Sequence, residues 1–112
     1  MKKSLTILLL ILPLAAGAGI NEDLLTAIQK GDIEKVSSLI EKGADVNVRD
    51  TDGVTALILA SQFGYADIVK LLIDNGANVN ARDDEGRTAL MKATIKRYKD
   101  IVKLLKAAGA KN

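Results

Sequence analysis

The chain repeats itself with a period of 33 residues, and this period constrains the fold more than any other feature of the sequence. The stretch GADVNVRDTDGVTALILA begins at Gly43, and GANVNARDDEGRTALMKA begins at Gly76. Residues 43–75 and 76–108 are identical at 18 of 33 positions, and a fainter copy precedes them at residues 21–42. A period of this length is typical of a solenoid, in which each unit buries its apolar face by stacking on its neighbours.

Each unit begins with a short predicted helix. Thr55 is a favourable N-cap, because its hydroxyl accepts a hydrogen bond from the first free backbone amides. The apolar spacing of Leu57 and Ala60 then predicts a helix over residues 56–63, which Gly64 ends in the left-handed conformation.

A second predicted helix and a turn complete the unit. Asp67 opens this helix, since a carboxylate is favourable near the positive end of the helix dipole. Its expected buried stripe consists of Ile68, Leu71 and Leu72, and Gly76 closes it. Residues 78–83 are expected to be extended, and the segments 50–53 and 83–86 to form turns that end in a glycine with positive φ.

These elements carry two specific motifs. D-x-x-G-x-T-A-L-x-x-A occurs at Asp50 to Ala60 and again at Asp83 to Ala93. D-I-V-K-L-L-x-x-x-G-A follows at Asp67 to Ala77 and at Asp100 to Ala110. In these motifs the chain resembles the ankyrin repeat family, over residues 21–110. The resemblance implies an all-α fold, an ankyrin-repeat solenoid of about three helix-turn-helix repeats with hairpin-like loops, at about 21–49, 50–82 and 83–112.

The chain departs from the family pattern at two points. Ala56 and Ala89 replace the usual proline, and Ile58 and Met91 replace the usual histidine, which should weaken the start of the helix and the polar links between loops. Arg97 replaces the glycine that ends the first helix, at a cost of roughly 1–2 kcal/mol if its backbone is left-handed.

The repeats also differ at their ends. Leu59 and Ile73 become Lys92 and Lys106 in the last copy, and Ser38 stands where the later copies have leucine. Polar residues at stacking positions are how a solenoid ends, so we expect a complete, monomeric three-repeat protein.

The first 18 residues have the layout of a secretory signal peptide. Lys2 and Lys3 precede an apolar run at residues 5–14, and small residues follow, with cleavage expected after Ala18 or after Gly17. The run is shorter than the ~20 residues that span a bilayer, although an uncleaved anchor or a buried helix is the alternative. We therefore expect a signal peptide at 1–18, a domain at 19–112, and a periplasmic or secreted protein.

Composition excludes several classes of function. The chain has no histidine and no cysteine, which removes Cys-His and Ser-His nucleophiles and the usual zinc sites. Neither phosphate-binding glycine motif is present, and the residues around Gly53 and Gly86 do not fit a calcium loop. We expect no enzyme activity, no catalytic or metal-binding residues and no cofactor. Without residues 1–18 the chain has 14 basic and 14 acidic residues, so no general attraction to nucleic acid is expected.

The resemblance implies a binding face for a protein partner. Ankyrin repeats contact partners with their loop tips and the exposed face of each first helix. The corresponding residues here are Gln29 and Lys30; Arg49, Thr51, Asp52, Val54, Gln62 and Phe63; and Arg82, Asp84, Glu85, Arg87, Ile95 and Lys96. Phe63, Ile95 and Val54 are apolar groups on a face expected to be wet, so they are either anchors for a partner or ordinary exposed residues. Tyr65 and Tyr98 are expected to pack within the repeats.

Charge divides the chain unevenly. Residues 87–112 hold 8 basic and 1 acidic groups, whereas residues 19–86 hold 6 basic and 13 acidic groups. Lys99, Lys103 and Lys106 share one face of the last helix. This basic patch is either a solvated end of the stack or a docking patch for an acidic partner or, weakly, an anionic membrane.

The sequence leaves the partner and its role open. An inhibitor or immunity protein against an exported toxin or enzyme is one hypothesis, because the chain is small, exported and without chemistry of its own. A stabilising scaffold for an envelope enzyme, for instance in stress defence, is the other.

Overall fold

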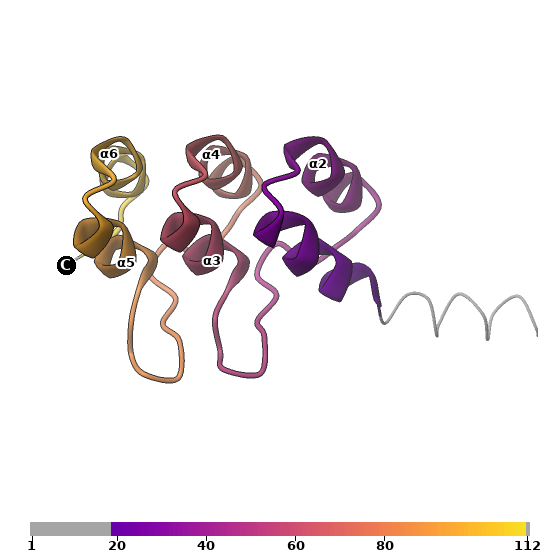
Figure 1. The fold of residues 1–112 in the computed structure, drawn as a ribbon, viewed down its shortest axis with the longest axis horizontal. Helices are drawn as coiled ribbons and strands as arrows, with labels where there is room; N and C mark the ends of the chain where they lie inside the picture. The colour runs from indigo at the N-terminus through magenta and orange to yellow at the C-terminus, as the bar shows by residue number, and fades with distance from the viewer. Residues whose placement is uncertain (1–18, 112) are drawn as a thin grey trace, which may run out of the picture.

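The structure, a computed structural model, describes residues 19–111 and shows a stack of helix pairs. Residues 19–29 are helical and are followed by α2 (Ile33–Glu41), α3 (Ala56–Phe63), α4 (Ala66–Asp74), α5 (Ala89–Lys96) and α6 (Lys99–Ala107). Figure 1 shows the first helices of the three pairs in one row and α2, α4 and α6 in a second. The predicted all-α solenoid is confirmed, whereas the predicted signal peptide at 1–18 lies outside the described residues.

The helix boundaries follow the local signals in the sequence. Thr55 Oγ1 accepts from the amide of Ile58 at 3.1 Å, and Thr88 Oγ1 accepts from the amide of Met91 at 3.2 Å. The predicted helix over residues 56–63 is thus confirmed with its N-cap, without the proline usual in the family. The second helices begin one residue before the predicted Asp67 and its counterpart Asp100, which lie in the first turn.

Arg97 has the backbone conformation that its position in the repeat predicts. It follows α5 with φ 62°, and among the described residues it is the one residue other than glycine with positive φ. Gly64, at the same place after α3, has φ 80°. The chain therefore accepts left-handed strain at Arg97 that a glycine would avoid.

The core is aliphatic and lies between neighbouring helix pairs. Val36, Ile68, Val69, Leu72 and Ile101 are each at most 1% exposed. The predicted stripe of α4 is wrong in one residue, because Leu71 is half-buried and Val69 is fully buried instead. In a stack a second helix has a neighbour on both sides, so its buried surface is wider than one stripe.

A tyrosine from one repeat covers a glycine of the repeat before it. A Cβ atom on Gly31 would lie 2.9 Å from Cζ of Tyr65, and one on Gly64 would lie 2.8 Å from Cζ of Tyr98. The Tyr65 hydroxyl also donates to the carbonyl of Gln29 at 3.3 Å. The expectation that both tyrosines pack within the repeats is confirmed. Glycine is required at these two positions for two reasons: Gly31 and Gly64 have positive φ, and a side chain there would meet the tyrosine ring.

Asparagine side chains hydrogen-bond one repeat to the next in the segments that follow the second helices. Asn47 Oδ1 accepts from the amide of Asn78 at 2.7 Å, and Asn80 Oδ1 accepts from the amide of Lys111 at 2.9 Å. The second bond is the first one shifted by 33 residues, and each joins one repeat to the next, so it fixes their relative placement.

We expect Gly64→Ala to destabilise the protein more than Gly76→Ala. Both glycines have positive φ (80° and 92°), and so both substitutions cost about 1 kcal/mol of backbone strain. Only Gly64 lies under a ring, and overpacking there adds about 1–3 kcal/mol, whereas a Cβ on Gly76 meets nothing within 4 Å. Urea denaturation of the two variants measures the difference, and equal losses would show that Tyr98 imposes no steric requirement.

Candidate functional site

The two long loops end in turns that carboxylates hold in place. Asp50 Oδ1 accepts from the amides of Asp52 and Val54 at 2.8 and 2.9 Å. Asp83 Oδ1 does the same for the amides of Glu85 and Arg87, at 2.9 and 2.8 Å. The predicted turns are confirmed, with φ 76° at Gly53 and 78° at Gly86. The turns leave the predicted tip residues Thr51, Asp52, Asp84 and Glu85 exposed.

Two arginines proposed for partner contact also brace these loops. Arg49 donates from one guanidinium nitrogen to the carbonyls of Gly53 at 3.0 Å and Arg82 at 2.7 Å. Arg82 donates to the carbonyl of Gly86 at 2.7 Å. The loops are further joined by the amide of Asp84, which donates to the carbonyl of Asp52 at 3.0 Å. The missing histidines therefore do not leave the loops unlinked, because arginine and backbone groups connect them.

Figure 1 shows both loops projecting to the same side of the stack, beyond the row of first helices. The face formed by the loop tips and the first helices, here called the loop face, is thus continuous across the repeats. The candidate contact residues predicted from the sequence lie in these loops and at the ends of the first helices.

Apolar side chains are exposed where the first helices end. Phe63 is 41% exposed and Ile95 is 74% exposed, while Val54 and Gln62 are half-buried. The Phe63 ring packs edge-on against Tyr65 with centroids 5.8 Å apart, which fixes its position. The predicted polar residues Gln29, Lys30, Arg87 and Lys96 are exposed as well.

Arg87 and Glu85 form an ion pair at 3.0 Å, with side chains 46% and 68% exposed. An exposed pair of this kind contributes little to stability. Both charges therefore remain accessible to a partner at the second loop.

The second turn lowers the pKa of the Asp83 carboxyl. The backbone hydrogen bond from Arg87 lowers the pKa of this carboxyl below its ordinary 3.8, against the opposing effect of burial, and the amide of Glu85 and the charges of Lys92 and Arg87 lower it further. The side chain is 8% exposed. Its charge serves the turn and is not available to a ligand.

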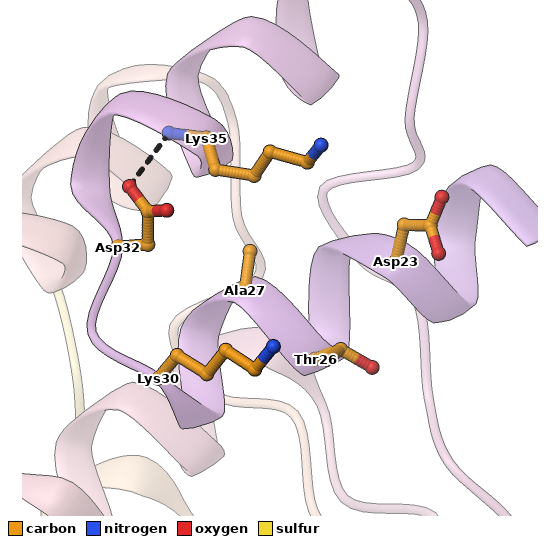
Figure 2. Close-up of a pocket in the computed structure, with 6 residues that line it drawn as sticks. All are labelled: Asp23, Thr26, Ala27, Lys30, Asp32 and Lys35. Carbon is orange, nitrogen blue, oxygen red and sulfur yellow. Dashed lines mark hydrogen bonds between the residues drawn. The ribbon is translucent and has the colours of Figure 1, made fainter.

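A hollow of about 320 Å³ lies at the N-terminal end of the stack. Figure 2 shows its lining: Asp23, Thr26, Ala27, Lys30, Asp32 and Lys35. The Asp32 carboxylate accepts from the amide of Lys35 at 3.1 Å, so it is the N-cap of α2. The hollow is lined by charges of both signs. Lys30 lines it, at the border between this end and the loop face.

The three lysines of the predicted basic patch lie together. Lys99, Lys103 and Lys106 are exposed and line one groove of about 460 Å³ at the C-terminal end, with Thr94, Arg97 and Val102. The sequence missed the apolar floor of this groove. The signal was present in Val102, which occupies the position of the buried Val36 and Val69.

The described residues show neither a metal site nor a membrane span. Within residues 19–111, no group of three or more acidic, histidine or cysteine side chains is placed to hold a metal ion. In the same range, no helix has the length and apolarity to cross a bilayer.

These features define a helical-repeat protein whose rigid stack presents one continuous face. The chain matches the family model for ankyrin repeats, in three copies, over residues 24–112, and it belongs to the ankyrin repeat family. Ankyrin repeats are protein-interaction modules and typically have no catalytic function, so the domain is a protein-binding module.

Two ankyrin repeat proteins of Rickettsia felis are similar to part of the chain. Each is 48% identical over 42 residues, which is 38% of this chain. The matched segment covers 67% of one relative and 64% of the other, so the chain spans about two thirds of their length.

We expect Asp83→Asn to cost about 1 kcal/mol of unfolding free energy near neutral pH, because two backbone amides lose a charged acceptor. The native pKa is depressed, so this stabilisation is present above the ordinary carboxyl pKa of 3.8 and is lost as the pH falls through the lower native value. Urea denaturation of both proteins at successive pH values should show their difference shrinking in acid.

Asp52→Asn is the matched control, since it removes the same charge from an exposed side chain of the neighbouring loop. A difference between wild type and Asp83→Asn that stays constant down to the lowest pH would contradict the role given to the Asp83 charge.

Proposed function

We propose that the protein binds one specific protein partner through its loop face. The observation that carries the proposal is the exposure of Phe63 and Ile95, at 41% and 74%, on adjacent repeats of a rigid scaffold. Large apolar side chains at such places act as anchors, because a partner gains most where it removes apolar surface from water.

The rigidity of the loops supports the same proposal. The Asp50 and Asp83 carboxylates accept hydrogen bonds that hold the two turns, and Arg49 donates a hydrogen bond that joins the loops to each other. A partner that binds the tips therefore does not have to order flexible segments, and this lowers the entropic cost of association. Asp52, Asp84 and Glu85 give the tips an acidic character, which favours a partner with basic groups opposite them.

We further propose that this binding takes place outside the cytoplasm. The support is the arrangement of residues 1–18, with a Lys-Lys head, an apolar run and Ala16-x-Ala18 before the repeats. The short basic head suits a bacterial signal, so the periplasm is the first choice and secretion the second. We propose that the released domain acts as a monomer.

The proposed setting gives two biological roles. As an inhibitor or immunity protein, the domain would cover the active site of an exported toxin or enzyme. As a stabilising scaffold, it would bind an envelope enzyme of stress defence and leave the active site open. The activity of a captured partner separates them, because the first role abolishes activity and the second preserves it.

We expect the variant Phe63→Ala/Ile95→Lys to lose a partner that the wild-type domain captures from envelope and culture fractions. Loss of two anchors costs about 2 kcal/mol each or more, which is enough to remove a complex from a pull-down. Ile33→Ala is the matched control, because Ile33 is 38% exposed but begins α2, in the row of second helices. Equal capture by both variants would place the partner elsewhere than on the loop face.

We expect the full chain to appear in the periplasmic or culture fraction of a bacterial host, shortened to begin at Gly19 or Ala18. Replacing the apolar run with Leu8→Arg/Leu9→Arg should retain it in the cytoplasm at full length, because charges in the apolar region prevent recognition as a signal. Cell fractionation with N-terminal sequencing measures both. A full-length chain found in the cytoplasm without these substitutions would refute the export proposal and leave the binding proposal intact.

A further inference from the structure

The two ends of the stack differ in chemistry. At the N-terminal end, several positions hold polar residues, whereas the same positions of the next repeat hold apolar residues that are buried or half-buried. Asp23 stands at the position of the buried Ala56, Lys35 at that of the buried Ile68, and Ser38 at that of Leu71. This end is therefore adapted to water.

The C-terminal end keeps its apolar stacking surface. Val102 is partly exposed, although Val36 and Val69 at the same position are 0% exposed. Thr94 is exposed, although Ile28 and Ser61 at its position are 0% exposed. The surface that covers a neighbouring helix pair inside the stack is here left open.

Two grooves hollow this end. One, of about 460 Å³, is lined by Thr94, Arg97, Lys99, Val102, Lys103 and Lys106. The other, of about 410 Å³, is lined by Arg87, Leu90, Met91, Thr94 and Ile95. Lys106 lies at this end as the sequence predicts, but Lys92, which was expected to close it, is half-buried and lines neither groove. The predicted polar closure is therefore incomplete, and an apolar centre remains.

The rim of these grooves is basic. Among residues 87–112 there are 8 basic groups against 1 acidic group, and five of them line the two grooves: Arg87, Arg97, Lys99, Lys103 and Lys106. Like charges at this density repel each other, and an acidic ligand relieves that repulsion.

We infer that the C-terminal end is a second docking site, which binds an acidic amphipathic helix of a partner protein. The apolar stripe of such a helix would lie over Val102 and Met91, and its carboxylates would meet the lysines of α6. The equivalent surfaces inside the stack already receive helices, since α3 packs on α5 and α4 packs on α6. Shape and charge thus point to the same occupant.

A second copy of the chain fits this end poorly. Its N-terminal end would place Lys35 and Ser38 against Val102 and the basic rim, where an apolar and acidic surface is needed. Two C-terminal ends would bring two basic rims together. Arg97 also replaces the glycine that takes a tyrosine ring at each internal junction, so a further repeat of this kind would meet its side chain.

The test uses designed peptides with the folded protein. The probe is a helix of about 18 residues, roughly five turns, with leucines in one stripe and glutamates elsewhere. One control has lysine in place of every glutamate, and the other has the same composition with the leucines scattered. Fluorescence anisotropy at low salt measures affinity, and amide chemical shifts of the isotope-labelled protein show where the peptide binds.

The acidic striped peptide should bind and shift the amide signals of Thr94 and Val102, and neither control peptide should. Lys103→Glu/Lys106→Glu should weaken binding by about tenfold, since each reversed contact costs on the order of 0.5–1 kcal/mol. Lys35→Glu/Lys42→Glu changes the net charge equally at the other end, and it should leave the affinity within about twofold. Val102→Asp should weaken binding without altering the loop face.

Four results would overturn the inference: no binding, equal binding of acidic and basic peptides, shifts confined to the loop face, or equal effects of the two double variants. Two more would replace it. A concentration-dependent doubling of mass in sedimentation would indicate a second copy, and salt-sensitive binding to phosphatidylglycerol vesicles alone would indicate a membrane surface. Ile95 lines both the loop face and one of these grooves, so Phe63→Ala alone, at a residue that lines neither groove, separates loss of the loop face from loss of this site. The shift map needs no variant and no natural partner, so failure here leaves the proposed function of the loop face untouched.

Discussion

The whole structure depends on the sharing of aliphatic side chains between neighbouring helix pairs. The named helices have eight or nine residues each, and helices of that length are marginal on their own. They persist because they pack on the helices of neighbouring pairs, which leaves Val36, Val69, Ile68 and Ile101 fully buried. The glycine–tyrosine contacts and the asparagine bonds then fix the register of the stack.

Stacking also produces the surface that a partner meets. Because each repeat is placed on the last, the two loops project to the same side of the stack (Figure 1). Phe63 and Ile95 are exposed in the last turns of α3 and α5, on adjacent repeats. Residues 32 positions apart in the chain thus act together. The same placement lets Arg49 reach the carbonyl of Arg82, which stiffens the face before any partner arrives. In a solenoid of this kind, residues that are the same in successive repeats form the scaffold, and residues that differ between repeats are the ones available to contact a partner.

The ends of the stack follow the same physical rule with opposite results. A terminal repeat loses one neighbour, and its outward positions must either become polar or find another cover. Lys35 and Ser38 give the first solution, whereas Val102 and Ile95 within a ring of arginine and lysine keep an apolar centre. The loop face and the C-terminal end meet at Arg87 and Ile95 but differ in chemistry, since one has acidic tips and the other a basic rim.

The sequence by itself determined the repeat, the helix pairs, the caps at Thr55 and Thr88, the turns at Asp50 and Asp83, and the strain at Arg97. These depend on contacts between residues a few positions apart, which local chemistry specifies. It did not determine that Val69 is buried, that Arg49 braces a second loop, or that Lys92 leaves the C-terminal end open. Only the tertiary structure decided these points, because each depends on which surface of a neighbouring repeat a side chain meets.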